Sequence, residues 1–231
     1  MRVDLHLHST ASDGIYSPKE VIQIALTHNL DAVALTDHDS VGGVDSARRA
    51  AEGKPLEVLP GIELSCRDGS EDRDLLAYLF DIEDTPLLNA LVEVREDRVR
   101  RAEKIVARLA EMGMSIPLET VRKQVSRGTV GRPHIARALL EHGYVTSFQE
   151  AFDRYLHDGG PADIPHLSLD PAQAIQLVHA AGGIVVLAHP VRCRDYRSVI
   201  ERLVPLGLDG VEVYYPDHTP EIIEDLRQIA R

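Results

Sequence analysis

Near its N-terminus the chain reads Val3-Asp4-Leu5-His6-Leu7-His8, in which polar and apolar residues alternate. A period of two is that of a β-strand, so Asp4, His6 and His8 lie on one face and the three apolar side chains on the other. The polar face could bind a metal ion, although a His-x-His pair taken alone is equally consistent with a structural role. The rest of the sequence has to decide between the two.

The same residue types recur at the ends of later predicted strands. Asp13 lies in a Ser-Asp-Gly turn, residues 36–39 read Thr-Asp-His-Asp directly after a predicted strand, and Glu63 and His189 each follow another one. Because the carboxyl ends of strands in parallel α/β folds meet at one mouth, we expect these groups to converge. Imidazole and carboxylate ligands suit Zn, Mn or Fe, and a carboxylate such as Glu63 can bridge two ions. A metal pair could generate hydroxide at neutral pH and neutralise phosphoryl oxygens.

Strand and helix patterns alternate over residues 1–86 and again from residue 171, which predicts an α/β fold with a parallel sheet or barrel. Between these parts only helical patterns occur, so we expect a helical insertion and domain boundaries of 1–86, 87–165 and 166–231. The predicted strands are 3–8, 32–35, 57–59, 75–80, 184–188 and 209–215; the predicted helices are 18–29, 87–112, 118–126, 133–142, 171–181 and 220–231.

The composition is that of a soluble globular protein: 231 residues, 44% hydrophobic and 27% charged. No apolar run is long enough to span a bilayer and no signal-peptide core is evident, so the expected compartment is the cytoplasm. Two cysteines provide no disulfide framework. A net charge of −12 argues against an extended nucleic-acid-binding surface, although it leaves a small anionic substrate possible.

Four motifs together resemble those of the polymerase and histidinol phosphatase (PHP) family. They are His6-Leu7-His8 with Asp13, Thr36-Asp37-His38-Asp39, Pro60-Gly61-Ile62-Glu63 and Ala188-His189-Pro190. The resemblance covers the whole chain and implies a distorted seven-stranded (β/α) barrel with a trinuclear metal centre. The helical insertion resembles that of one subgroup, the nucleoside 3′,5′-bisphosphate phosphatases and the RNase AM-type 5′→3′ exoribonucleases.

The resemblance also implies which residues hold metal. We expect two to three divalent ions, with manganese as the first expectation and zinc, iron or magnesium as alternatives. His189 could in addition protonate the leaving oxygen. The implied ligands are His6 and His8 for one ion, Asp13 and His38 for a second, His189 for a third, and Glu63 as the bridge.

In that subgroup the insertion supplies arginines to the substrate phosphates. Here Arg98 and Arg101 are three residues apart on one face of a predicted helix, where they could grip a phosphate. A solvated charged face is the alternative. Arg132 matches the arginine of the second insertion motif, and His134 beside it is a weaker candidate that could instead cap a helix or pack.

The chain departs from the family pattern in two places. Where the subgroup has a metal-binding histidine before Leu-Leu-Gly-Tyr, this chain has Asp74, which either ligates a metal with altered preference or is an exposed carboxylate. The late Gly-Ser-Asp-x-His segment is also missing, because the sequence given ends at Arg231. We therefore expect a barrel that lacks its last strand, either as a piece of a longer protein or as an incomplete variant.

These observations predict a metal-dependent phosphoesterase whose substrate is a nucleotide or a short oligonucleotide. It would cleave phosphate monoesters or terminal phosphodiesters with metal-activated hydroxide. Two alternatives stay open: a phosphatase for another small ester such as histidinol phosphate, and a non-catalytic metal-binding PHP domain. His166 and His218 could also approach the substrate. The sequence leaves the oligomeric state undecided.

Overall fold

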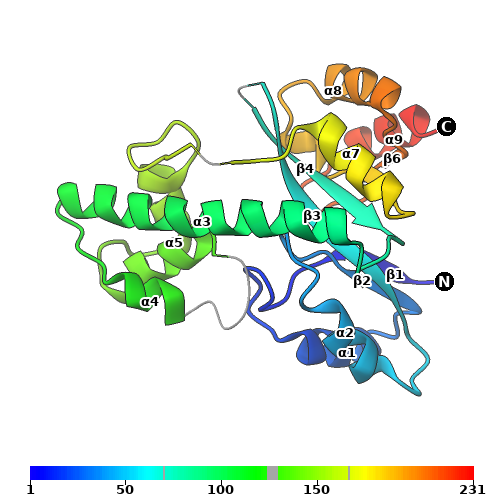
Figure 1. Cartoon of the computed structure of the whole chain (residues 1–231), viewed down its shortest axis with the longest axis horizontal. Helices are drawn as coiled ribbons and strands as arrows, with labels where there is room; N and C mark the ends of the chain where they lie inside the picture. The colour runs from blue at the N-terminus through cyan, green and yellow to red at the C-terminus, as the bar shows by residue number, and fades with distance from the viewer. Residues whose placement is uncertain (70, 124–129, 166) are drawn as a thin grey trace.

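The computed structural model describes residues 1–69, 71–123, 130–165 and 167–231, and within them the chain forms one curled sheet surrounded by helices (Figure 1). Six described strands make up this sheet in the order in which they occur along the chain. They are β1 (Val3–Leu7), β2 (Ala32–Leu35), β3 (Glu57–Asp68), β4 (Glu71–Tyr78), β5 (Ile184–Leu187) and β6 (Gly210–Val211). The fold is α/β, as the sequence predicts.

The prediction of a parallel sheet is wrong at its centre. Strands β1, β2 and β3 are parallel and so are β5 and β6, but β4 runs antiparallel to both β3 and β5. Strand β3 continues to Asp68, nine residues beyond the predicted end at 59, and only two residues separate it from β4. So short a connection can join only antiparallel strands. This β3–β4 hairpin places Glu63 and Asp74 on the two central strands of the sheet.

The helices begin and end close to the predicted positions, with three additions. Helix α1 has the predicted capping box, in which Ser17 Oγ accepts from Glu20 N–H at 3.3 Å and the Glu20 carboxylate accepts from Ser17 N–H at 2.8 Å. Helices α2, α6 and α8 were not predicted, and residues 124–126 of the predicted helix 118–126 lie outside the described residues. The helices are α1 (Pro18–Thr27), α2 (Val44–Ala51), α3 (Thr85–Glu111), α4 (Leu118–Lys123), α5 (Arg132–Glu141), α6 (Phe148–Ala151), α7 (Pro171–Ala180), α8 (Tyr196–Leu203) and α9 (Pro220–Ile229), with a π-helical turn η1 (Phe152–Leu156) and 3₁₀ turns η2 (Pro190–Arg192) and η3 (Val204–Leu206).

Two of the buried clusters share one long helix. The strand core is built on β3, β4, β5, α7 and α8, and the helical core on α4, α5, α6 and η1. Helix α3 contributes Leu87 and Leu91 to the first and Ile105 and Leu109 to the second. With 27 residues it is about 40 Å long, and in Figure 1 it extends from the sheet to α4 and α5. Its many charged residues leave it too polar for a bilayer, and none of the helices in the described ranges could cross one.

Candidate metal centre

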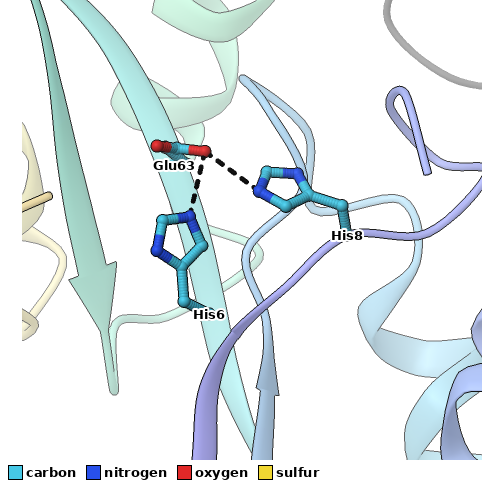
Figure 2. A group of neighbouring side chains, drawn as sticks. All are labelled: His6, His8 and Glu63. Carbon is cyan, nitrogen blue, oxygen red and sulfur yellow. Dashed lines mark ion pairs between the residues drawn. The ribbon is translucent and has the colours of Figure 1, made fainter. Parts of the chain in front are cut away.

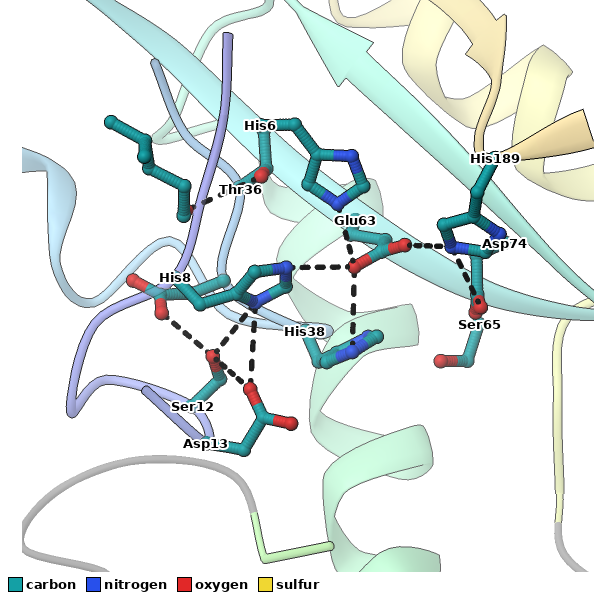
Figure 3. Close-up of polar contacts among 12 residues, drawn as sticks. His6, His8, Ser12, Asp13, Thr36, His38, Glu63, Ser65, Asp74 and His189 are labelled. Atoms are coloured by element: carbon teal, nitrogen blue, oxygen red, sulfur yellow. Dashed lines mark hydrogen bonds and ion pairs between the residues drawn. The ribbon is translucent and has the colours of Figure 1, made fainter. Parts of the chain in front are cut away.

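Five segments bring six of the seven predicted ligands together at one end of the sheet, and the loop after β1 adds the seventh, Asp13 (Figure 3). The carboxyl end of β1 supplies His6 and His8, and the loop after β2 supplies His38. The other ligands come from β3, from β4 and from the residue pair that follows β5; they are Glu63, Asp74 and His189. The parallel strands thus converge as expected, whereas Asp74 arrives through the unpredicted hairpin.

Glu63 lies at the centre of this cluster and is 1% exposed. Its Oε2 atom is 3.3 Å from His6 Nε2 and 3.1 Å from His8 Nε2 (Figure 2). His38 Nε2 lies 3.3 Å from the same oxygen, and His189 Nε2 lies 2.9 Å from Oε1. Burial alone would oppose ionisation, but the surrounding imidazoles hold the pKa of Glu63 well below its usual range. The carboxylate is therefore anionic and offers both oxygens to whatever the imidazoles bind.

The donor atoms fit divalent metal ions. Three sets of side chains each bring their ligand atoms within 4.8 Å of one another, and neighbouring sets share residues. The nitrogen and oxygen donors are those that suit first-row divalent cations. Burial and the nearby Glu63 carboxylate also raise the pKa of Asp74, a crowding of negative charge that bound cations would relieve. The sets are His6–His8–Glu63, His8–Asp13–His38 and His38–Glu63–Asp74.

Asp74 faces the cluster. Its Oδ2 atom lies 3.6 Å from His189 Nε2, and it shares a ligand set with His38 and Glu63. Of the two interpretations of this residue, its surroundings favour a ligand over an isolated surface carboxylate.

Glu212, just after β6, is a member of the site that the sequence did not reveal. Its Oε1 lies 2.8 Å from His6 Nδ1, and its Oε2 accepts from the backbone N–H of His189 at 2.6 Å. Burial opposes the charged ring, but hydrogen bonds to Glu212 and Glu63 raise the pKa of His6 to about 10. Once a bound cation displaces the proton from Nε2, this contact would keep the remaining proton on Nδ1 and leave Nε2 directed at the ligand cluster.

The loop after β1 is held by the buried Asp37. Its Oδ1 accepts from Ser9 N–H and from Ser12 Oγ, each at 2.7 Å, and its Oδ2 accepts from Ser9 Oγ at 2.7 Å. The loop carries Asp13, whose Oδ1 lies 3.5 Å from His8 Nδ1. Asp37 belongs to a motif that the sequence singled out, and here it acts on the loop and is absent from the ligand sets.

Two residues of the site have left-handed backbone conformations that L side chains rarely adopt: Asp39 with φ 49° and His189 with φ 27°. The Asp39 backbone N–H donates to Glu63 O at 2.9 Å, and the His189 N–H donates to Glu212. These contacts hold both residues in the strained conformation, at a cost of order 1–3 kcal/mol each.

The cluster opens into a cavity of about 690 Å³ that is also lined by the predicted arginines. Arg98 is anchored at its base: Nε donates to Asp39 Oδ2 at 2.7 Å and Nη2 to Ser65 Oγ at 2.5 Å. Its Nη1 has no hydrogen-bond partner among the described residues and lies towards Gly131. Arg98 is therefore held in place with donors left for a ligand.

Arg101 and Arg132 line the same cavity. Arg101 Nε donates to Ile164 O at 2.6 Å, and Arg132 Nη1 donates to Leu156 O at 3.0 Å. Burial lowers the pKa of Arg101, and so do the positive charges of Arg132 and Arg98. Arg101 also pairs with Asp163 at 3.1 Å and Arg132 with Asp158 at 2.5 Å, so these carboxylates neutralise part of the positive charge that an anion would meet in the cavity.

The other predicted candidates lie elsewhere. His134 is 1% exposed, does not line this cavity, and accepts the Gly131 N–H at 3.1 Å through Nδ1 at the start of α5. This contact is consistent with the capping alternative, and His134 also lies close enough to Asp13 for their charges to interact. His218 is buried with Nδ1 2.9 Å from Val213 O and is also absent from the cavity wall, and His166 lies outside the described residues.

Arg137, Arg192 and Tyr215 are among the further residues that line the cavity and were not predicted. Arg137 Nη2 donates to the backbone oxygen of Asp13 at 2.9 Å. Arg192 Nη2 donates to Tyr215 Oη at 2.6 Å, and the Tyr215 ring lies 5.4 Å from that of His189. None of them forms part of a spaced motif, so no local signal in the sequence marks them.

A curled α/β sheet with a buried histidine–carboxylate cluster at one strand end is the arrangement of a metal-dependent hydrolase. The PHP domain family matches residues 4–157, and the chain belongs to this family.

Named relatives agree with that assignment. The 5′-3′ exoribonuclease of Haemophilus influenzae is 34% identical over 92% of this chain and 78% of its own length. The 3′,5′-nucleoside bisphosphate phosphatase of Chromobacterium violaceum is 32% identical over 99% of this chain and 81% of its own. A proposed metal-dependent phosphoesterase of Bifidobacterium adolescentis has a solved structure that superposes with a TM-score of 0.92 at 32% identity, covering 99% of this chain and 83% of that one.

Proposed function

We propose that this chain is a phosphoesterase that hydrolyses phosphate monoesters or terminal phosphodiesters of nucleotides with the help of two to three divalent metal ions. The observation that carries the proposal is the gathering of four imidazoles around the two oxygens of Glu63, in a cavity that three arginines also line. The names of the relatives support nucleotides or RNA as the substrate class.

Each part of the site has a separate role in this proposal. His6, His8, Asp13, His38, Glu63, Asp74 and His189 would hold the ions, for which manganese is our first choice. Bound ions would supply an activated water and neutralise phosphoryl charge. Arg98, anchored by Asp39 and Ser65, would fix one phosphate through its remaining donors. Arg101 and Arg132 would hold the substrate in the same cavity.

The proposal also assigns the helical elements to the substrate. Residues 87–165 would form an inserted domain that covers the centre, because α3 and α5 bring Arg98 and Arg132 to the cavity. His189 would be the proton donor to the leaving oxygen whenever it is not engaged as a ligand, since its ring is 8% exposed and lies on the cavity wall.

The experiment that tests this function measures metal content and turnover on the same preparation. We expect two to three equivalents of bound divalent metal and release of phosphate from adenosine 3′,5′-bisphosphate or from a 5′-phosphorylated oligoribonucleotide. The substitution His8→Ala removes a residue common to two ligand sets. It should lower the amount of bound metal, and it should lower the turnover rate by at least about 100-fold.

His28→Ala is the matched control, because His28 is an exposed residue that caps α1 far from the ligand sets. It should bind metal and turn over as the unaltered chain does. Metal-free protein without turnover would refute the enzyme proposal and favour the non-catalytic alternative. Turnover of histidinol phosphate in preference to both nucleotides would refute the substrate class.

A further inference from the structure

Part of the cavity wall is apolar, because two aromatic side chains line it beside the charged residues. Phe148 begins α6 and Phe152 begins the π-helical turn η1, four residues later. Their ring centroids are 5.2 Å apart, and both residues line the cavity that contains the ligand cluster and the arginines. A π-helical turn is uncommon and is found frequently at functional sites.

The two rings have different surroundings. Phe152 is half-buried and packs against the helical core. Phe148 is 39% exposed and belongs to none of the hydrophobic clusters of the described residues. Core packing therefore accounts for the aromatic side chain at Phe152, but it does not account for the exposed ring of Phe148.

Arg137 connects Phe148 to the ligand cluster. Its guanidinium carbon lies 6.0 Å from the centroid of the Phe148 ring, and its Nη2 donates to the Asp13 backbone oxygen at 2.9 Å. A single side chain therefore spans the distance from the loop of Asp13 to the aromatic ring. The arginine is held in place on one side and presents the rest of its planar guanidinium to the cavity.

Aromatic rings and guanidinium planes are the groups on which proteins stack unpaired bases. A phosphate held among the metal ligands and Arg98 would leave the nucleoside of the same molecule to extend along the cavity wall, where Phe148 and Arg137 lie. We propose that Phe148, supported by Arg137, is the stacking surface for the nucleobase of the substrate. This inference rests on the proposed function. Because every base has a π-face, such a surface selects for the presence of a base and not for its identity.

The test compares a substrate with a base and one without. KM for adenosine 3′,5′-bisphosphate and for ribose 5-phosphate is measured for the unaltered chain and for Phe148→Ala. The substitution should raise KM for the nucleotide by about 5- to 100-fold more than KM for the sugar phosphate, with a smaller change in kcat. Phe148→Tyr, which retains the π-face, should restore the nucleotide KM to within about three-fold.

Leu140→Ala is the matched control: Leu140 is 40% exposed, lies on α5 and does not line the cavity. It should change neither KM. Equal effects of Phe148→Ala on the two substrates, or no effect on either, would overturn the stacking surface. Equilibrium binding of both compounds to the metal-loaded chain is measured in parallel, so that the KM ratios have a counterpart in affinity. An unaltered chain that binds the nucleotide without cleaving it would refute the proposed function, while the binding ratios would still decide the role of Phe148.

Discussion

At the scale of single residues, one carboxylate ties together two proposed metal ligands. Glu212 contacts the ring of His6 with one oxygen and the backbone of His189 with the other. Groups that orient ligands in this way change metal affinity by about 10- to 100-fold when they are removed. Glu212→Gln should therefore weaken Mn²⁺ binding by that factor, measured by calorimetric titration of the metal-free chain.

Glu212→Asp, which retains the negative charge, should recover part of that affinity. Glu224→Gln changes an exposed glutamate on α9 and should leave the affinity unchanged. Equal Mn²⁺ affinity in Glu212→Gln and in the unaltered chain would show that the carboxylate only supports the fold.

The sequence predicts ligands better than it predicts the residues that hold them. His6 could be found because it lies on the polar face of an alternating strand, and His38 and Glu63 because each follows a strand pattern whose end points to the mouth of the fold. Glu212 could not, because the residue it orients lies 206 positions away and a lone glutamate inside the predicted strand 209–215 has no distinguishing spacing. Arg137 is missed for a related reason, since on an amphipathic helix it resembles any solvated arginine.

At the scale of elements, one side chain just before the edge strand β6 contacts both β5 and α7. Asp209, which precedes β6, accepts from Val185 N–H on β5 and lies beside His179 Nε2 on α7, each at 2.8 Å through Oδ2. Burial opposes ionisation, but these hydrogen bonds lower the pKa of Asp209. A lowered pKa means that the native state favours the charged form.

Asp209→Asn should therefore lower the free energy of unfolding at pH 6 by up to about 1 kcal/mol, a modest value because the side chain is 37% exposed. The stabilisation is present above the ordinary aspartate pKa of about 3.9 and is lost as the pH falls through the lowered value. Urea unfolding between pH 3 and 6 should show the difference shrinking as the pH falls. Asp217→Asn, at an exposed aspartate beyond β6, is the control. A difference independent of pH would contradict this account.

Strand direction was the part of the fold that the sequence could not provide. Apolar runs such as Leu75 to Phe80 identify a buried strand, but its direction depends on how the chain reaches it. The β3–β4 turn falls between two stretches rich in charged residues that do not resemble a strand in isolation. Hydrogen-bonded pairing within the hairpin stabilises these charged stretches as strands, although their intrinsic β-propensity is low.

At the scale of the whole molecule, the division into 1–86, 87–165 and 166–231 remains a prediction that stability measurements can test. Leu91 and Leu109 are both fully buried on α3, one in the strand core and one in the helical core. Truncation of either to alanine should cost about 2–5 kcal/mol. If the helical segment is a separate unit, hydrogen exchange in Leu109→Ala should accelerate in α5 while β4 and β5 stay protected.

Leu91→Ala serves as the counterpart on the same helix. It should accelerate exchange in α7 and β5, where its neighbours lie. Uniform acceleration across both cores in each variant would instead identify a single cooperative unit.

Helix α3 also limits how this chain can change in length over evolution. Each residue inserted into a helix turns everything beyond it by about 100° and displaces it by about 1.5 Å. A single insertion between Leu91 and Ile105 would swing one set of buried side chains out of its core, and one before Arg98 would carry that guanidinium away from Asp39. Natural variation in length should therefore accumulate in the connections around α4 and α5 and be rare inside α3, which keeps the spacing between the sheet and the helical core constant across relatives.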